Sequence, residues 1–403
     1  MTIETPPRLV KLLTRSFMAD PYPALRKMQQ EQAAVPIENG GLRMWVVTRY
    51  KDARMILADP TLRRDLVRNR HAVVGQNLVS IERKPKLPHE IKRSMLDQDG
   101  ADHRRLRGVA SKFFSPSALA AMRPKIEQVA DDLLDQLPAG EPVDLVKSYA
   151  RALSITCLSD LLGVPEYARS TFPLWETAIL TASSKEGAEE AGRQLYALAS
   201  EIIALKRAEP ADDLFTQLVS VPDDVMDHVE LISMITFLLI AGLEPASAIG
   251  SGVLALLKHP EELAILLANM ELLPGCVDEI LRYEPPFRML TPRYLDRPLP
   301  LDGITIPAGE LILVSAGAAN RDPDRYEDPD QFRVTRCPKG HLGFGHGSHR
   351  CLGAELGRLE ATIALGKLLH RFPGIRLAVP PDDVTWRPGI YMRRLEALPV
   401  VLA

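Results

Sequence analysis

Apolar residues recur every three or four positions along most of the chain, which is the spacing of one face of an α-helix. The pattern predicts helices over residues 124–137, 149–162, 187–207, 225–257, 261–269, 273–283 and 351–371. Strand-like stretches are short and lie mostly beside proline or glycine, at residues 44–48, 299–306, 310–315 and 398–402. The sequence therefore predicts a mainly α protein with small peripheral β-sheets.

One long irregular stretch interrupts this pattern. Residues 320–349 are rich in proline, glycine and aspartate, and a loop of this length in a compact protein usually has a function. No Gly/Ser linker or low-complexity segment divides the chain of 403 residues. We therefore expect residues 1–403 to form one domain.

The charge and hydropathy of the chain exclude several classes of partner. Its 49 basic and 52 acidic residues give a net charge of −3, without the basic excess that nucleic-acid binding needs. The most apolar stretch, residues 231–242, contains Ser233 and Thr236 and is too short to span a bilayer. The first residues lack the pattern of a secretory signal. We expect a cytoplasmic protein that binds neither nucleic acid nor a membrane.

One cysteine stands in a distinctive setting. The four cysteines show no disulfide-scaffold spacing, so a reducing compartment would keep them as thiols. Cys351 ends a glycine-punctuated loop, residues 344–353, and precedes a predicted helix. Glycines let a backbone approach a flat cofactor, and amides at a helix start lower the pKa of a cysteine. The loop suits a thiolate ligand, while a buried free cysteine beside a glycine turn is the alternative.

This loop resembles the FxxGxHxCxG signature of the cytochrome P450 superfamily, with matches at Phe344, Gly347, His349, Cys351 and Gly353. The resemblance implies haem b (iron protoporphyrin IX), with Cys351 as the iron ligand and Phe344, His349 and Gly353 beside the haem. A thiolate pushes electron density onto haem iron and favours O–O cleavage. The similarity extends in order over nearly the whole chain. It implies the P450 fold, a helix-rich body with small sheets.

A charged pair on the predicted helix 273–283 has two interpretations. Glu279 and Arg282 are three residues apart and share a helix face, so they can form an ion pair. By itself such a pair would indicate only a solvated surface. The segment is similar to the ExxR motif of the superfamily. That resemblance implies a buried structural network behind the haem, completed by Arg336.

A second helical pair provides hydrogen-bond donors for an anion. His103 and Arg107 are four residues apart, and both can donate to an anionic group. The resemblance implies that they bind the haem propionates together with Arg293 and His349. The alternative is that His103 lies on an exposed helix.

The central helix departs from the family pattern. Ala241, Gly242 and Glu244 match the oxygen groove, but Pro245 stands where a threonine is usual. Proline has no hydroxyl and bends a helix interior. Ser247 is rotated by roughly 200° along the helix and does not replace the hydroxyl. Either Pro245 is a tolerated kink, with protons supplied by water and Glu244, or oxygen activation depends on water, Glu244 or a polar substrate group.

The resemblance also assigns a distal substrate pocket. It comprises Phe237, Ile240, Ala241 and Glu244; Phe287, Arg288, Met289, Leu290 and Thr291; and Ile390, Tyr391 and Met392. Most of these residues are apolar, which favours a medium-sized hydrophobic metabolite. Arg288 has two interpretations, a ligand for a carboxylate or carbonyl and an outward-facing solvated side chain, and we expect the second. The basic, irregular residues 66–92 are predicted to form a mobile lid.

The resemblance implies a monomeric monooxygenase that hydroxylates or epoxidises a hydrophobic small molecule of secondary metabolism. Oxygen comes from O2, and electrons come from a separate ferredoxin and ferredoxin reductase, since no reductase domain is fused. Arg104 and Arg105 are interpreted as solvated, or alternatively as a docking site for the donor. Oxidative coupling, desaturation and peroxide-driven oxidation remain alternatives, which Pro245 favours. A non-catalytic haem protein that binds a ligand or senses gas is another.

Overall fold

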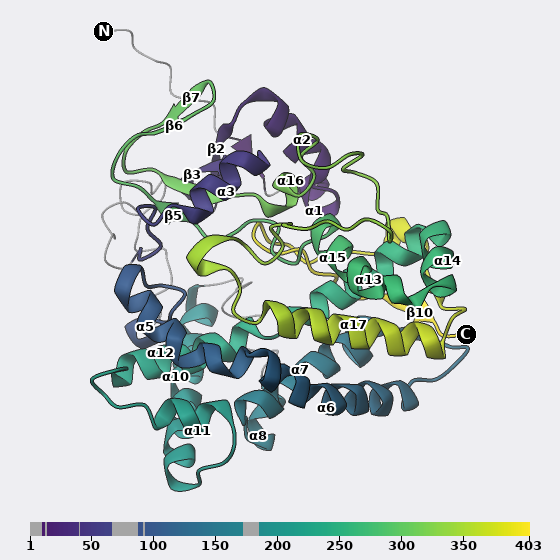
Figure 1. The fold of residues 1–403 in the computed structure, drawn as a ribbon, viewed down its shortest axis with the longest axis horizontal. Coiled ribbons are helices and arrows are strands. Elements are labelled where there is room, and N and C mark those ends of the chain that lie inside the picture. Colours follow the sequence, from purple (N-terminus) through teal and green to yellow (C-terminus); the bar gives the residue numbers. More distant parts are fainter. Residues whose placement is uncertain (1–9, 13, 40, 67–87, 92, 172–184) are drawn as a thin grey trace.

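The computed structural model describes residues 10–12, 14–39, 41–66, 88–91, 93–171 and 185–403. As predicted, helices form most of the molecule; in Figure 1 most of the short strands lie at the upper left, and β10 lies at the right beside the C-terminus. Most of the predicted lid, residues 67–87 and 92, lies outside the described residues.

The centre of the helical body is built around the helix that follows the cysteine loop. This helix, α17 (Ala354–Arg371), packs against α6 (Pro116–Asp135), α13 (Pro245–Lys258) and α15 (Leu273–Tyr283). Leu153, Ile249, Ile280 and Leu365 belong to the buried cluster between these elements. The apolar stripes that predict the helices are therefore the surfaces on which they pack.

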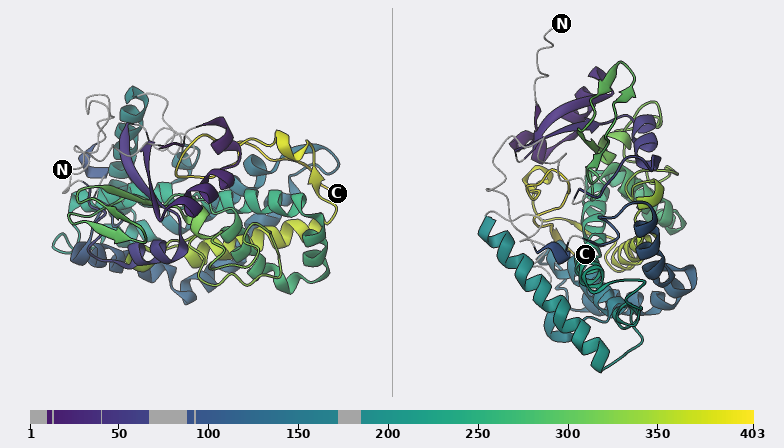
Figure 2. Two further views of the ribbon diagram at one scale, coloured as in Figure 1. Left: turned by 90° about the horizontal axis from the view of Figure 1, so that it is seen from above. Right: turned by 90° about the vertical axis from the view of Figure 1, so that its left-hand side faces the viewer.

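A second group of helices covers one side of this centre. It comprises α5 (Gly100–Ser111), the π-helical turn Val146–Arg151 that leads into α7 (Ala152–Leu162), α8 (Glu166–Arg169), α10 (Lys185–Ala208), α11 (Leu214–Val219) and α12 (His228–Ala241). The right-hand view of Figure 2 shows α10 along an outer edge of the molecule. The short helices α1 (Arg15–Ala19), α2 (Tyr22–Glu31), α3 (Tyr50–Ala58), α14 (Pro260–Ala268) and α16 (Ala316–Ala319) complete the described set.

The described strands form three small sheets. The largest has the order β1 (Val10–Lys11), β2 (Ala34–Asn39), β3 (Leu42–Val47), β8 (Leu311–Val314) and β5 (Arg293–Tyr294). In it β2 and β3 form an antiparallel hairpin, whereas β3 and β8 are parallel. The other sheets are β4 (Pro142–Asp144), β10 (Pro399–Val401) and β9 (Arg376–Leu377), and the hairpin β6 (Leu299–Leu301) and β7 (Ile304–Ile306). Strand β5 brings Arg293 to the centre of the molecule.

The predicted single helix 225–257 is in fact two helices. Helix α12 ends at Ala241, and α13 starts at Pro245. The expectation that Pro245 bends a helix interior is therefore wrong. Proline at the first position of a helix loses no intrahelical hydrogen bond, because the amides of the first turn have no partner there. A Cβ at Gly242 would collide with the side chain of Leu158, so the break is packed closely against α7.

The segment His228–Lys258 is long and apolar enough to cross a membrane by length and composition alone. However, 61% of its most apolar window is buried inside the protein. Such burial is usual for helices that run through a protein core.

Candidate functional site

A large cavity lies where the α12–α13 break, the cysteine loop and the start of β5 meet. It holds about 1640 Å³ of empty space, including its opening. Most of the predicted site residues line it, namely His103, Arg107, Phe237, Ala241, Gly242, Glu244, Pro245, Phe287, Leu290, Thr291, Arg293, Phe344, His349, Cys351 and Gly353. The structure thus brings together residues that are up to 250 positions apart in the sequence, from His103 to Gly353.

The cysteine loop presents the thiol of Cys351 to this cavity. The amide of Cys351 donates to the Phe344 carbonyl at 2.8 Å, which closes the loop on itself. Gly347 adopts a φ of +75°, and a Cβ there would collide with the backbone of Leu57. Only glycine combines this backbone conformation with such close packing. Cys351 therefore has a fixed position three residues before α17.

Opposing influences act on the Cys351 thiol. Burial raises its pKa above the ordinary value, while a hydrogen bond from the Gly353 backbone and the charges of Arg107, Arg350 and Arg358 lower it. The side chain is nonetheless accessible from the cavity. These are the surroundings of a sulfur whose negative charge needs a further partner, such as a metal ion.

Arginine and histidine side chains gather on another part of the cavity wall. The rings of His103 and His349 lie 4.1 Å apart, and His349 Nε2 is 3.7 Å from Asp99 Oδ1. Burial, together with the charges of His349 and Arg107, lowers the pKa of His103 to about 4. Burial also lowers the pKa of Arg293 to about 10. This part of the cavity favours a ligand with negative charges.

These features fit a haem. One wall offers a thiol for the iron, and another offers buried cations for two carboxylates of the porphyrin. The Arg107 guanidinium has neither a hydrogen bond nor an ion pair among the described residues, although burial lowers its pKa. A half-buried guanidinium without a partner gains from a negatively charged ligand, so this wall favours an anionic cofactor.

The predicted ExxR residues form a completely buried network. Arg282 donates to both carboxylate oxygens of Glu279, at 2.7 and 2.8 Å, and neither side chain is exposed. Arg336 donates to the same carboxylate at 3.2 Å. Arg282 also donates to the carbonyls of Asn320, Pro329 and Gln331. The network therefore fixes the start of the long loop that leads to Cys351.

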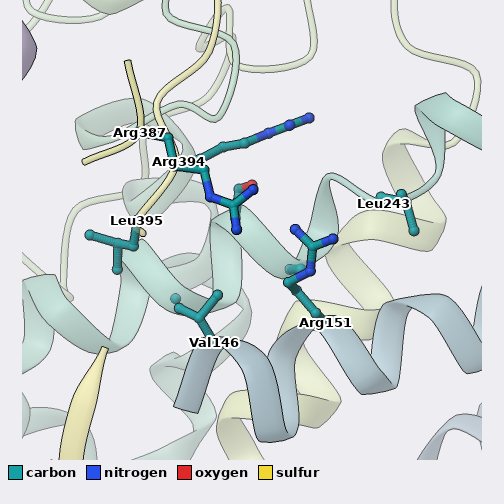
Figure 3. Close-up of a pocket in the computed structure, with 9 residues that line it drawn as sticks. Val146, Arg151, Leu243, Arg387, Arg394 and Leu395 are labelled. Carbon is teal, nitrogen blue, oxygen red and sulfur yellow. The ribbon is translucent and has the colours of Figure 1, made fainter. Parts of the chain in front are cut away.

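Glu244 forms an ion pair with Arg394, a residue that the sequence analysis did not identify. Ser247 Oγ also donates to the Glu244 carboxylate at 3.3 Å. Arg394 and Ser247 line a second, small cavity together with Arg151 and Arg387 (Figure 3). As predicted, Ser247 faces away from the main cavity. No sequence signal pointed to Arg394, because it lies 150 residues after Glu244.

Glu360 is a second acid that the sequence analysis missed. It lies on α17 in the wall of the main cavity, is 1% exposed, and its Oε2 has no hydrogen-bond partner among the described residues. Burial raises its pKa to about 8, and the nearby Ser154 hydroxyl opposes this only in part. Glu360 is therefore a proton-binding group inside the cavity wall.

Only some of the residues predicted for the substrate pocket lie at this cavity. Phe237, Phe287, Leu290 and Thr291 line the cavity, but Ile240, Met289, Ile390, Tyr391 and Met392 are not among its lining residues. Met289 and Ile390 pack instead into the core beside the large sheet, and Ile240 packs against the α10–α12 core. Sequence similarity marks the segments but does not show which face of each segment meets the cavity.

Two arginines differ from their expected surroundings. Arg288 is not solvated: it is 1% exposed, donates to the Ile390 carbonyl at 3.0 Å and lies over the Phe17 ring. Arg105 pairs with Glu230 at 2.7 Å and links α5 to α12. In both cases a partner far away in the sequence holds the guanidinium, and Arg288 is fully buried while Arg105 stays partly exposed. Arg104 is exposed, as expected.

Comparisons with known proteins agree with this geometry. The family model for cytochrome P450 matches residues 265–390. Cytochrome P450 107B1 of Saccharopolyspora erythraea is 41% identical over 388 residues, which cover 96% of each chain. This chain belongs to the cytochrome P450 family. Within the family, the mycinamicin IV hydroxylase/epoxidase of Micromonospora griseorubida is 38% identical over 90% of both chains.

A solved P450 structure shows the same fold. The P450 monooxygenase TamI, bound to tirandamycin C, superposes with a TM-score of 0.91 at 36% identity, over 98% of this chain and 100% of TamI. The predicted mainly α P450 fold is thereby confirmed.

We expect the buried Glu279–Arg282 pair to be critical for stability. Replacement of Arg282 by methionine leaves the Glu279 carboxylate buried without its main partner, which should lower the free energy of unfolding by about 3–5 kcal/mol. Denaturant unfolding of the purified protein measures this loss. Arg333→Gln is the control, because its pair with Asp328 is solvated and contributes at most about 1 kcal/mol. Equal losses in the two variants would contradict the assignment.

Glu360 should make stability depend on pH. Its pKa is raised from 4.5 to about 8, so the folded protein binds this proton more tightly than the unfolded chain does. The resulting stabilisation is complete below the unfolded pKa and is lost as the pH rises through about 8. Relative to Glu360→Gln, the wild type should lose about 1.4 kcal/mol per pH unit over this interval. Parallel pH profiles of unfolding would refute this expectation.

Proposed function

We propose that this P450 is a haem-thiolate monooxygenase that hydroxylates or epoxidises a hydrophobic small molecule of secondary metabolism. The observation that carries the proposal is the placement of the Cys351 thiol and a group of arginine and histidine side chains on the wall of one cavity. Family membership and the hydroxylase/epoxidase activity of the mycinamicin IV relative support the reaction type. The apolar side chains of Phe237, Phe287 and Leu290 in the cavity wall favour an apolar substrate.

The cofactor in this proposal is haem b. Cys351 would ligate the iron, His103, Arg107, Arg293 and His349 would bind the propionates, and Phe344 and Gly353 would lie beside the ring. When bound, the haem would supply the binding and reductive activation of O2, with electrons from a separate ferredoxin and ferredoxin reductase. We expect the enzyme to act as a cytoplasmic monomer.

Glu244 is the proposed proton donor of the distal side. It lies at the helix break in the cavity wall, and neighbouring Pro245 has no hydroxyl to share this task. Arg394 and Ser247 hold the carboxylate on the side of the small cavity. Protonation neutralises the Glu244 carboxylate and so removes its electrostatic attraction to Arg394. Protonation of Glu244 and its release from Arg394 are therefore coupled. Water that enters through the small cavity would return a proton to Glu244. Ala241 and Gly242, which have small side chains or none, leave room for O2.

Substitution of Cys351 tests the thiolate assignment. We expect the reduced wild-type protein to give the carbon monoxide difference spectrum of thiolate-ligated haem, and Cys351→Ala to lose it. Cys337→Ala, which removes an exposed thiol that does not line the cavity, should leave the spectrum unchanged. An alanine variant at position 351 that bound haem with the wild-type spectrum would overturn the proposal.

Glu244→Gln tests proton delivery. It removes the proton donor but keeps the shape, so the rate of product formation should fall at least about tenfold. Ligand-induced spin-state shifts should change little, because ground-state binding does not depend on the donor. Product formed per electron consumed should fall in parallel. Unchanged rate and coupling would exclude Glu244 from this role.

Two further experiments address the alternatives. If Pro245 has a mechanistic role, Pro245→Thr should change the ratio of product to electrons consumed, and equal ratios and rates would show that the proline has none. Reaction under labelled O2 distinguishes the reaction classes. Label in the product indicates insertion, whereas an unlabelled product with a new bond or double bond indicates coupling or desaturation.

A further inference from the structure

Arg64 is a buried cation in the main cavity to which the sequence analysis gave no role. Its side chain lines the cavity together with Arg107 and Arg293, and the residue is only 9% exposed. Within the described part of the chain, its guanidinium makes no hydrogen bond and lies in no ion pair. Arginines buried to this degree normally bind a carboxylate or several carbonyls. We therefore expect the guanidinium of Arg64 to bind an acceptor group of a ligand in the cavity.

The backbone on both sides of this side chain is fixed. Arg63 exchanges two backbone hydrogen bonds with Tyr294 on β5, at 2.8 and 2.7 Å. The amides of Arg64 and Asp65 both donate to Asp99 Oδ2 at 2.9 Å. The backbone is thus fixed from Arg63 to Asp65, and this fixed backbone directs the Arg64 side chain toward the cavity.

Charges of both signs surround Arg64, but none of them forms an ion pair with its guanidinium. Burial and the charge of Arg293 lower the pKa of Arg64 to about 10, with Asp97 and Asp99 opposing. Both acids have other partners: Asp97 accepts from Ser94 at 2.7 Å, and Asp99 accepts from the two backbone amides. Neither carboxylate forms an ion pair with the guanidinium. A ligand that brings negative charge to this place would remove an electrostatic cost.

Arg64 lies among the proposed propionate ligands. Its charge acts on His103, His349 and Arg293. Asp99 connects the two groups physically, because it binds the amide of Arg64 and also approaches His349 at 3.7 Å.

We propose that Arg64 is a further haem-propionate ligand, which forms a charge-assisted hydrogen bond to one of the two carboxylates. The proposal rests on the haem cofactor assigned above. It makes Arg64 a positioning residue: it fixes one edge of the porphyrin through the segment that precedes residues 67–87. Its positive charge would also favour the reduced, less positive form of the iron.

Arg64→Gln tests the proposal, with Arg63→Gln as the matched control. Arg63 is adjacent and carries the same charge, but its side chain is 52% exposed and its pair with Asp296 is 4.0 Å long. Haem transfer from the purified holoprotein to an excess of apomyoglobin measures the dissociation rate. We expect this rate to rise at least about tenfold in Arg64→Gln, the effect of one lost charge-assisted hydrogen bond. It should stay at the wild-type value in Arg63→Gln.

The midpoint potential of the haem gives a second readout. Arg64→Gln should shift it to more negative values, because loss of a nearby cation stabilises the ferric form. Arg64→Lys keeps the charge and should retain the wild-type potential, while losing haem faster since lysine lacks the planar fork of donors. If Arg64→Gln does not fold, the lysine variant still tests the hydrogen bond.

The outcomes separate three interpretations. Unchanged haem dissociation and potential in Arg64→Gln would overturn the proposal. If those values are unchanged but carboxylate-bearing ligands lose affinity while neutral ligands do not, Arg64 binds a substrate anion and the proposal is wrong. A wild-type protein that binds no haem would instead refute the proposed function itself.

Discussion

The position of the Cys351 thiol depends on one buried ion pair, formed by Glu279 and Arg282. Taking a carboxylate and a guanidinium out of water is costly unless every donor and acceptor finds a partner. Glu279 and Arg282 meet this condition by combining with each other, with Arg336 and with carbonyls of residues 320–331. Carbonyls of residues 320–331 complete the hydrogen bonding of Arg282, and the ion pair in turn fixes this part of the loop. The glycine-rich turn around Cys351 then begins from a fixed base, which explains how so irregular a segment holds the thiol in one position.

The second organising feature is the uneven distribution of charge around the cavity. Buried arginines and imidazoles gather near Asp99, whereas the distal wall is largely apolar, with Glu244 tied to Arg394. An anionic cofactor would relieve the repulsion between the arginines near Asp99. It would need no counter-charge on the apolar distal wall. Under the proposed function, charge orients the cofactor and apolar contact selects the substrate. The two tasks use different residues of one cavity.

Much of the fold was predictable because helical periodicity and short motifs are local properties. The helices around Glu279 and after Cys351, and the mutual approach of His103, Arg107, Arg293 and His349, follow from such patterns and from the family resemblance. The break between α12 and α13 was not predicted, because periodicity continues across Gly242 and Pro245 while the packing of Leu158 against that glycine is a tertiary contact.

The residues that the sequence analysis missed share one property. Arg394 owes its significance to a partner far away in the sequence, whereas Arg64 and Glu360 owe theirs to burial in the cavity wall, and none of the three belongs to a short motif. The misplaced Arg288 is a similar case: it is polar, yet carbonyls from residues 389 and 390 make its burial favourable. Local patterns predict where a segment lies, but the surroundings of a long charged side chain depend on the whole fold.

The link between Glu244 and Arg394 joins the middle of the molecule to its carboxyl-terminal sheet. Arg394 is followed directly by Leu395, which forms a bridge with Trp386 and packs in the same core as β10. Sliding or fraying of that sheet would therefore move the arginine while leaving the thiol and the cations near Asp99 in place. Separate parts of the scaffold therefore position Glu244 and Cys351: the carboxyl-terminal sheet acts on the first, and the loop fixed by Glu279 and Arg282 acts on the second.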